Sequence, residues 1–384
     1  MSANGDPALI ALLHDEIRAH GPITFARFMA LALYHPTHGY YQKAVRVGRE
    51  GDYLTAPEAH PIFGWTLARQ LDDCWQLLGR PEPFVLREYG PGPGTLIHSL
   101  IEGLDRIGTP LSQRLWYQPV EPSAAHRAAL EERLTAHGLG QRLLDATAQP
   151  ITGVVLANEV LDALPFHRVS WHDGQLWEQY VDWQEGRLVA VEGPPSTPAL
   201  AETLHALGVT LAEGQTTEIC LALADWVAEV AKALERGYVL VLDYGYPVPE
   251  RYDPQRFPHG TLKTYRAHTV SDDPLTAVGE QDITAHVDFS LLAHYAHQHG
   301  LTVLGLTTQA EFLAQAGLGD ILVALQHEPG MTAHQYLAAR AAAFHLLDPA
   351  GLGRFRVMIL GKNVPPTPPR GLGQRLLCGV APSH

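Results

Sequence analysis

The 384-residue sequence predicts an α/β protein in which a parallel sheet is covered by helices. After Pro81, short apolar runs are separated by candidate helices or insertions, an alternation that is typical of parallel sheets. Residues 1–80 precede them and predict a helical region with a long irregular loop. Further along, the turns HDG and QEG separate runs of alternating apolar and polar residues, which predicts a β-meander inserted after the fourth parallel strand.

The N-terminal region predicts two helices. The run ALIALLHDEIRAH has the spacing of an amphipathic helix, and Thr24 is placed to cap a second helix over FARFMALAL. Residues 35–61 are rich in Gly, Tyr and Pro, which predicts the long loop.

We expect a main domain over residues 81–362, with insertions at about 166–215 and 244–288 and a tail over 363–384. Its parallel strands are predicted from five apolar runs: FVLREYG, LWYQPVEP, RLLDATA, GVVLANE and YVLVLDYGY. HGLTVLGLTT predicts a further strand, and RFRVMILGKN predicts a last strand at the sheet edge, either parallel or antiparallel. The second insertion lacks periodicity and predicts a long loop, either functional or disordered.

The composition argues against several classes of function. Lys and Arg total 27 against 41 Asp and Glu, a net charge of −14 without a basic cluster, so no nucleic-acid partner is expected. The cysteines are far apart and the histidines complete no ligand set, so no metal site is predicted. No apolar run has the length of a membrane span and the N-terminus lacks a basic n-region; we expect a cytoplasmic protein with no membrane partner.

The glycine-rich stretch EYGPGPG follows the first predicted strand, where open α/β folds bind ligands. Gly90, Gly92 and Gly94 have neither the GxGxxG spacing of dinucleotide sites nor a following GK[ST]. Pro91 and Pro93 lack N–H groups, and a phosphate cradle is built from N–H groups. A tight turn without a ligand is the alternative, but the residues argue against a phosphate.

Acidic residues around this turn favour a cationic ligand. Glu88 lies at its mouth, where a carboxylate would repel phosphate and attract a cation. S-adenosylmethionine fits, because it carries an ammonium and a sulfonium and no phosphate. Glu121 ends the second strand, where an acidic residue can accept hydrogen bonds from both ribose hydroxyls. Asp145 ends the third strand and is either an adenine ligand or a turn cap.

A second polar group, NEVLDALPFHR, follows the fourth strand at the same sheet edge. For Asn158 and Asp162, capping of a turn or helix is the simpler interpretation. Glu159 is harder to explain in this way. A carboxylate there could hold and orient a cationic methyl acceptor such as a guanidinium, or equally an amine.

Six ordered blocks run from about residue 20 to about residue 310: YHPTHGYY, GDYLTAPEAHPIFG, EYGPGPGTL, NEVLDALPFHR, LVLDYGY and GTLKTYRAHTVSDDPLTAVGEQDITAHVDFS. Together they resemble the MidA family of S-adenosylmethionine-dependent methyltransferases, whose mitochondrial members are arginine methyltransferases that assist assembly of respiratory complex I. The resemblance implies a Rossmann-like, seven-stranded class I methyltransferase fold with family-specific insertions near the acceptor.

The resemblance also implies roles for single residues. The resemblance places the cofactor role on Glu88, Gly90, Gly92, Gly94 and Glu121, and the acceptor side on Asn158, Glu159 and Asp162. We therefore predict Glu159 and Asp162 as catalytic residues, and we add Asn158 and, from its strand position, Asp145 to the predicted cofactor-binding residues. Further family positions are expected to cover the cofactor or shape the acceptor channel: Thr55, Pro57 and Glu58 in the first loop, and Gln281, Asp282, His286 and Asp288 in the second insertion. Pro93 departs from the family pattern, where a basic or small polar residue is frequent.

Three functions follow as hypotheses. The first is methyl transfer to an arginine of a protein, with a respiratory complex I subunit as the first substrate to test. The second is an assembly factor that binds the cofactor without turnover, since fold does not settle activity. The third is a small-molecule N-methyltransferase. A monomer or a homodimer is expected in each case, and a nicotinamide dehydrogenase ranks last because of the two prolines in the turn.

Overall fold

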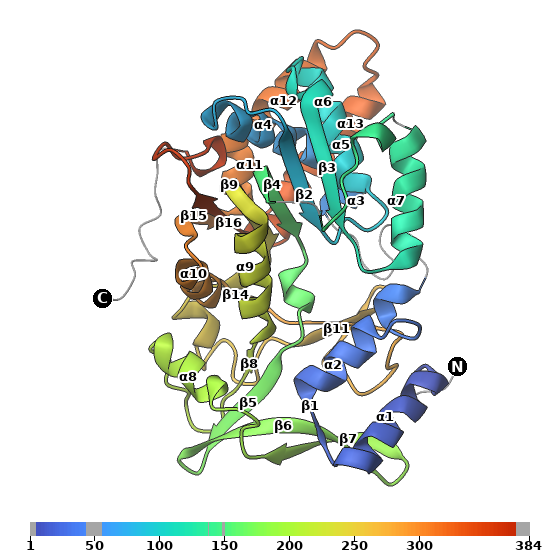
Figure 1. Ribbon diagram of the computed structural model, residues 1–384, viewed down its shortest axis with the longest axis vertical. Helices are drawn as coiled ribbons and strands as arrows, with labels where there is room; N and C mark the ends of the chain where they lie inside the picture. The colour runs from blue at the N-terminus through green and yellow to red at the C-terminus, as the bar shows by residue number, and fades with distance from the viewer. Residues whose placement is uncertain (1–4, 44–55, 137, 148–149, 374–384) are drawn as a thin grey trace.

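The computed structural model describes residues 5–43, 56–136, 138–147 and 150–373 (Figure 1). A large sheet with helices on both faces lies at one end of the long axis, and a smaller antiparallel sheet lies at the other. We call these the central sheet and the insertion sheet. In the part of the chain that is described, no helix combines the length and the apolar character that a membrane span requires.

The central sheet is mixed and has six strands among the described residues: β2 Phe84–Tyr89, β3 Leu115–Val120, β4 Ile151–Asn158, β9 Leu234–Asp243, β15 Thr302–Thr308 and β16 Arg356–Lys362. Their order is β15-β16-β9-β4-β2-β3. Neighbours from β3 to β9 are parallel, whereas β16 is antiparallel to both β9 and β15. Four of the five runs predicted as parallel strands are thereby confirmed.

The fifth run, RLLDATA, is not a strand, and the prediction was wrong here. Leu143 makes a single parallel bridge to Tyr117 of β3, and the Leu144 N–H donates to the Tyr117 carbonyl at 2.8 Å. The Asp145 carboxylate then accepts hydrogen bonds from the N–H and the hydroxyl of Thr147, at 2.7 and 2.5 Å. This local turn competes with a continued ladder, so the extended segment ends after one bridge.

The run RFRVMILGKN forms β16, but the strand lies inside the sheet and not at its edge. Its neighbours are β9 and β15, so β15 is the edge strand. Val357 and Ile359 pack on one face of the sheet, and Met358 and Leu360 pack on the other. A strand that is apolar on both faces belongs in the interior, and this pattern was visible in the sequence.

Helices cover both faces of the central sheet. One face packs against α4 Ile62–Leu77, α5 Thr95–Ile107, α11 Gln309–Ala316, α12 Leu318–Gln326 and α13 Ala333–Leu347. The other face packs against α9 Ala222–Ala233 and α10 Phe289–Gln298. The short helix α6 Leu111–Arg114 and the helix α7 Ala124–Ala136 come directly before and after β3. Parallel strands are buried on both faces in this arrangement, which explains their nearly continuous apolar runs.

The insertion sheet contains β1 Ile23–Thr24, β5 His167–His172, β6 Gln175–Gln184, β7 Arg187–Gly193 and β8 Thr216–Ile219. Strands β5, β6 and β7 form the predicted antiparallel meander. The sequence did not predict that β8 would extend it beside β5, or that β1 from the N-terminal region would pair with β6. Helix α8 Ala199–Ala206 lies between β7 and β8 in the chain.

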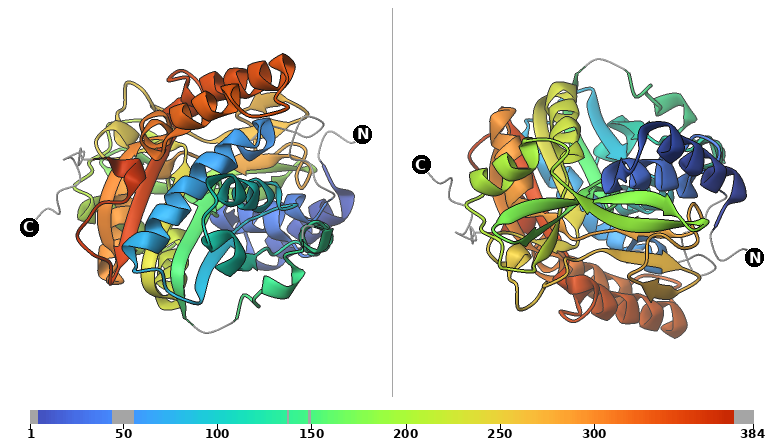
Figure 2. Two further views of the ribbon diagram at one scale, coloured as in Figure 1. Left: turned by 90° about the horizontal axis from the view of Figure 1, so that it is seen from above. Right: turned by 90° about the horizontal axis from the view of Figure 1, so that it is seen from below.

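The N-terminal helices pack against the insertion sheet. Helix α1 spans Pro7–His20 and α2 spans Phe25–Tyr34, and the short α3 follows at Ala56–Ala59. The Thr24 hydroxyl accepts from the Arg27 N–H at 3.2 Å, so the predicted cap is confirmed. Viewed from below, the insertion sheet crosses this end of the molecule beside α1 and α2 (Figure 2).

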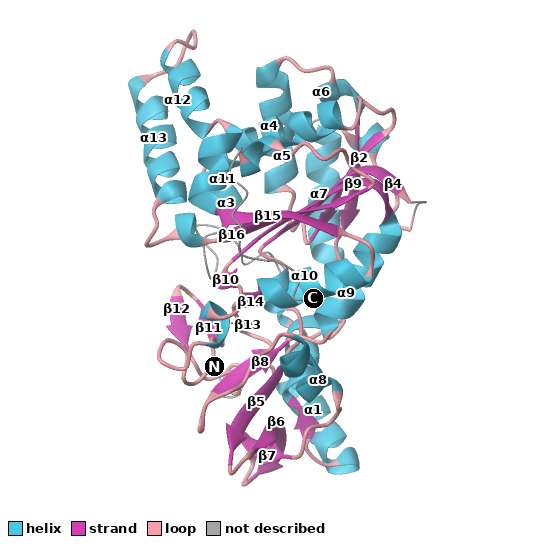
Figure 3. Cartoon of the chain, turned by 90° about the vertical axis from the view of Figure 1, so that its left-hand side faces the viewer, coloured by secondary structure: helices cyan, strands magenta, loops and turns pink. Residues whose placement is uncertain are grey.

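The segment from Tyr244 to Asp288 contains regular structure, although its sequence predicted a long loop. A parallel pair, β10 Gly245–Tyr246 and β14 Val287–Asp288, lies between the two larger sheets (Figure 3). A three-stranded sheet is formed by β11 Lys263–Arg266, β12 Thr269–Ser271 and β13 Asp282–Thr284, in the order β12-β11-β13. Each strand is too short to show a period in the sequence.

A buried ion pair ties this segment to β8. Arg251 Nη2 lies 2.8 Å from Glu218 Oε2, and both side chains are almost fully buried. Glu218 also accepts from the Thr261 N–H at 2.9 Å, and the Arg251 Nε–H donates to the His286 carbonyl at 3.2 Å. The pair of charges therefore holds together the parts of this segment around Arg251, Thr261 and His286.

Removing one charge of this pair should destabilise the fold strongly. Arg251→Ala leaves the Glu218 charge buried without its main partner, which we expect to lower the free energy of unfolding by about 3–5 kcal/mol. The control is Arg114→Ala, which breaks an exposed pair with Glu82 at 3.5 Å and should change stability by about 1 kcal/mol or less. Urea unfolding measures both variants, and equal effects of the two would contradict the expectation.

Candidate active site

The glycine turn lies between β2 and α5 at the carboxyl edge of the central sheet. Gly90, Gly92 and Gly94 all have left-handed backbone conformations, with φ of 60°, 54° and 80°. At Gly94 a Cβ atom would lie 2.5 Å from a methyl group of Leu130, and at Gly90 it would lie 3.1 Å from one of Val160. Backbone conformation requires glycine at all three positions, and close packing requires it at Gly94 as well.

The structure places Glu121 against this turn. Its carboxylate accepts hydrogen bonds from the Gly92 N–H at 3.1 Å and from the Ser123 N–H at 2.8 Å. A carboxylate has about four lone-pair sites, so acceptor capacity remains for ligand hydroxyls. The end of β3 and the glycine turn are thus joined by one acidic side chain, as the sequence predicted from strand order.

Glu88 is buried behind the turn on β2. It is 3% exposed, and its Oε2 accepts from the Tyr117 hydroxyl at 2.7 Å. Burial raises its pKa to about 7, and the charge of Glu121 adds to this effect. A positive ligand at the turn would favour the ionised form of Glu88, so the site is electrostatically suited to a cation.

Glu159 follows β4 and has a left-handed backbone, with φ of 53°. Its Oε1 accepts from the Ala56 N–H and from the Asn158 side-chain amide, both at 3.4 Å. Burial is the main cause that raises its pKa to about 8, and the charge of Asp243 acts in the same direction. The contact with Ala56 places α3, which carries Pro57 and Glu58, beside this carboxylate. Thr55 lies outside the described residues.

Asp162 lies one short turn further, in the 3-10 helix Leu161–Ala163. Its side chain is 7% exposed and accepts a hydrogen bond from the Tyr244 hydroxyl. Burial, followed by the charges of Asp243 and Asp282, raises its pKa well above the ordinary range. Glu159 is partly exposed and Asp162 is buried, so one turn carries two acids at different depths.

Three other predicted residues have side chains engaged in structural contacts. Asp145 is exposed and its carboxylate bonds to its own turn at Thr147. Asp288 caps α10 by accepting from the N–H groups of Ser290 and Leu291, each at 2.9 Å, and it accepts from the Tyr252 hydroxyl at 2.7 Å. His286 packs among aromatic rings, and burial lowers its pKa to about 3, so it is neutral.

Several residues of this region were not assigned a role from the sequence. The Tyr34 hydroxyl donates to the Ala163 carbonyl at 2.9 Å, and the Tyr41 hydroxyl donates to Asp282 at 2.8 Å. Asp243 is fully buried at the end of β9. A signal for Asp243 existed, because a polar residue that ends a strand next to β4 must lie at the same sheet edge as Glu159.

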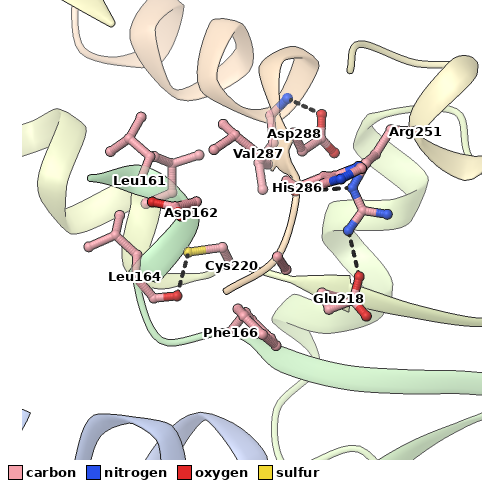
Figure 4. A pocket seen from close by; sticks show the side chains of 13 residues that line it. Leu161, Asp162, Leu164, Phe166, Glu218, Cys220, Arg251, His286, Val287 and Asp288 are labelled. Carbon is pink, nitrogen blue, oxygen red and sulfur yellow. Dashed lines mark hydrogen bonds and ion pairs between the residues drawn. The ribbon is translucent and has the colours of Figure 1, made fainter. Parts of the chain in front are cut away.

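A small cavity lies behind the turn (Figure 4). It has a volume of about 20 Å³ and is lined by residues of the turn, of β8 and of the segment before α10, including Asp162, Phe166, Cys220 and His286. This volume holds one water molecule and excludes a cofactor. Burial also raises the pKa of Cys220 to about 12, so its thiol is not ionised near neutral pH.

Comparisons with known proteins identify the class of this chain. Residues 66–307 match a family model described as "Putative S-adenosyl-L-methionine-dependent methyltransferase". The chain belongs to this family, and its cofactor is S-adenosylmethionine. The resemblance of the six sequence blocks to the MidA methyltransferases is confirmed.

Similar proteins cover almost the whole chain. "Protein arginine methyltransferase NDUFAF7 homolog, mitochondrial" of Drosophila melanogaster is 30% identical, over 94% of this chain and 86% of that protein. The Homo sapiens protein arginine methyltransferase NDUFAF7 is 28% identical, over 85% and 77%. A crystal structure from Burkholderia thailandensis, bound to S-adenosyl-homocysteine, is 34% identical with a TM-score of 0.87, covering 96% of this chain and 95% of that one.

The residues at the glycine turn fit this cofactor. The turn has no side chains at its three glycines and no N–H at its prolines, and the carboxylates of Glu88 and Glu121 lie beside it. Glu121 would hold the ribose hydroxyls, and Glu88 would offset the positive charge of the amino acid moiety. When bound, S-adenosylmethionine supplies an electrophilic methyl group.

Loss of the Glu121 carboxylate should weaken cofactor binding. Hydrogen bonds to a charged group contribute about 1.5–3 kcal/mol, so we expect Glu121→Ala to raise the Kd of S-adenosylhomocysteine about 10- to 100-fold. Glu131→Ala on the exposed side of α7 is the control and should leave the Kd unchanged. Isothermal titration calorimetry measures both, and an unchanged Kd for Glu121→Ala would remove this residue from the cofactor site.

Proposed function

We propose that the chain transfers the methyl group of S-adenosylmethionine to an arginine side chain of a protein substrate. The observation that carries this proposal is the pair of acids on the turn after β4, the partly exposed Glu159 and the buried Asp162. Strand β4 is the neighbour of β2, with Ala157 paired to Tyr89, so their carboxyl ends bring this turn close to the glycine turn. The methyl donor and the acids that would hold an acceptor then meet at one edge.

The acceptor should be a cation. In the part of the chain that the structure describes, Glu159 accepts hydrogen bonds from amide groups alone, and nearby carboxylates raise its pKa further. A guanidinium supplies the missing positive charge and can bind a carboxylate through two parallel hydrogen bonds. The site is therefore better suited to arginine than to a neutral side chain.

The same carboxylates can assist the reaction. A guanidinium has a pKa above about 12, so the enzyme cannot wait for a neutral acceptor. Glu159 holds the guanidinium and concentrates its reactivity on one nitrogen, and the positive charge of the guanidinium favours the ionised form of Asp162 beside it. The acceptor nitrogen loses one proton as the new N–C bond forms. Glu159, with a pKa near 8 before the acceptor binds, is suited to take up that proton.

The names of the relatives support a protein arginine as acceptor, and the net charge of −14 suits a basic substrate segment. A respiratory complex I subunit is the first candidate, in the cytoplasm, with the enzyme as a monomer or homodimer and without nucleic-acid or membrane partners. The central sheet would be the seven-stranded class I methyltransferase arrangement, with the predicted third strand reduced to the Leu143 bridge beside β3.

Replacing Glu159 tests the proposal directly. Glu159→Gln keeps the shape of the side chain and removes its charge, so we expect kcat for arginine methylation to fall at least about 100-fold. The Kd of S-adenosylhomocysteine should change less than about twofold. The assay follows labelled methyl groups from S-adenosylmethionine into proteins of a host lysate, with the modified arginines located by mass spectrometry.

The matched control is Glu202→Gln on the exposed surface of α8, which should keep wild-type activity. Tight cofactor binding by the wild type without methyl transfer to any protein would favour the binding-factor hypothesis. Transfer to small molecules alone would favour the third hypothesis. Full activity of Glu159→Gln would contradict the role given to this carboxylate.

The raised pKa of Glu159 also predicts how stability depends on pH. Between the ordinary carboxyl value of 4.5 and the folded value of about 8, the unfolded chain binds fewer protons at this group than the folded chain. Stability therefore falls as pH rises through this range. Glu159→Gln lacks this loss of stability, so the difference between its urea midpoint and that of the wild type should increase in favour of the variant from pH 5 to pH 8. The urea midpoint of Glu202→Gln should change with pH as that of the wild type does. A difference that does not vary with pH would contradict the prediction.

A further inference from the structure

Asp243 makes an unusual set of hydrogen bonds at the end of β9. Its Oδ2 accepts from three successive N–H groups across the sheet, those of Val160, Leu161 and Asp162, at 3.2, 3.0 and 3.3 Å. Its Oδ1 accepts from the Tyr244 N–H at 2.8 Å, and the side chain is fully buried. One carboxylate thus satisfies the first N–H groups of the turn that follows Glu159.

These contacts fix the backbone on both sides of Glu159. The Glu159 N–H donates to the Leu242 carbonyl at 2.9 Å, and the next three N–H groups donate to Asp243. Glu159 has φ of 53°, a left-handed conformation that is unfavourable for a residue with a Cβ and persists where the surroundings hold it. The end of β9 therefore fixes the backbone from which the Glu159 side chain extends.

Capping alone does not explain why a carboxylate, and not a neutral side chain, accepts hydrogen bonds from the N–H groups of residues 160–162. Asp243 lies beside the acids Glu159 and Asp162 of the turn and beside Tyr244, which follows it directly after β9. Asp282 of β13 lies close to both turn acids. Burial raises the pKa of Asp243 to about 7, although its hydrogen bonds to four N–H groups oppose this, so the charged form is costly for a structural role alone. It is useful where three N–H groups must be held firmly, because bonds to a charged acceptor are the stronger ones.

We infer that Asp243 is a positioning residue for methyl transfer, which holds Glu159 in its left-handed conformation and so aims the Glu159 carboxylate at the acceptor. The inference rests on the proposed function for the acceptor, because it acts through Glu159. Both Asp243 oxygens accept from backbone N–H groups and the side chain is fully buried, so it acts through the turn and not by contact with the reacting atoms. The sequence block LVLDYGY then contributes to the site through its aspartate.

A double-mutant cycle separates positioning from general support of the fold. Asp243→Asn should lower kcat about 10- to 100-fold and leave the Kd of S-adenosylhomocysteine within about twofold. Because Asp243 acts through Glu159, the variant with both Asp243→Asn and Glu159→Gln should be no slower than Glu159→Gln alone. Losses that multiply in the double variant, or an unchanged kcat in Asp243→Asn, would overturn the inference.

Hydrogen exchange tests the same inference without turnover. In Asp243→Asn the amides of residues 160–162 should exchange at least about tenfold faster, while the rest of the central sheet keeps its protection. Asp6→Asn is the control, because Asp6 accepts from the Ala8 and Leu9 N–H groups at the start of α1, and its effect should stay there. Unchanged exchange at residues 160–162 would overturn the inference.

The two readouts also separate this inference from the proposed function. A wild type that methylates no protein would contradict the proposed function, and hydrogen exchange would still decide whether Asp243 holds the turn. If Asp243→Asn does not fold, Asp243→Glu keeps the charge but displaces the carboxylate, and the same losses and the same faster exchange are expected from it.

Discussion

The active site depends on how the turn after β4 is held. Asp243 binds its N–H groups from β9, the Tyr34 hydroxyl binds the Ala163 carbonyl from α2, and the Ala285 N–H binds the Asp162 carbonyl at 3.0 Å. The central sheet, the N-terminal region and the second insertion therefore meet at residues 159–163. A turn that is fixed from three sides loses little freedom when an acceptor binds, and such preorganisation is what a methyl transfer in line requires.

The acid of the buried ion pair and the acids at the sheet edge differ in their surroundings. Glu218 has Arg251 and Arg168 beside it, and although burial opposes this, their charges hold its pKa below the ordinary value. Burial instead raises the pKa of Glu88 to about 7 and of Glu159 to about 8. An ion pair satisfies the structural acid within the chain, whereas the acids at the sheet edge become favourable when a positive ligand arrives.

Local sequence signals predicted the parts of the site that strand order alone determines. Glu121 and Glu159 could be placed together because parallel strands end at one edge, and Thr24 could be read as a cap from its neighbours. The apolar residues on both faces of β16 indicate an interior strand, but its two neighbours β9 and β15 could not be predicted, because strand order depends on pairings between segments far apart in the sequence. For the same reason the contacts of Asp243, which reach across 81 to 83 residues, leave no local pattern.

Different parts of the chain contribute to the predicted cofactor side and acceptor side of the site. The glycine turn and Glu121 belong to the central sheet. The turn acids are held by Asn158 and Asp243 of the central sheet, but groups from outside the sheet reach them as well: the Ala56 N–H bonds Glu159, and the Ala285 N–H bonds the Asp162 carbonyl. Strand β1 of the N-terminal region also pairs with β6 of the meander. Because a sheet that binds a methyl donor can serve many reactions, we expect the choice of acceptor to depend on the N-terminal region and the insertions, which contribute groups beside the turn acids.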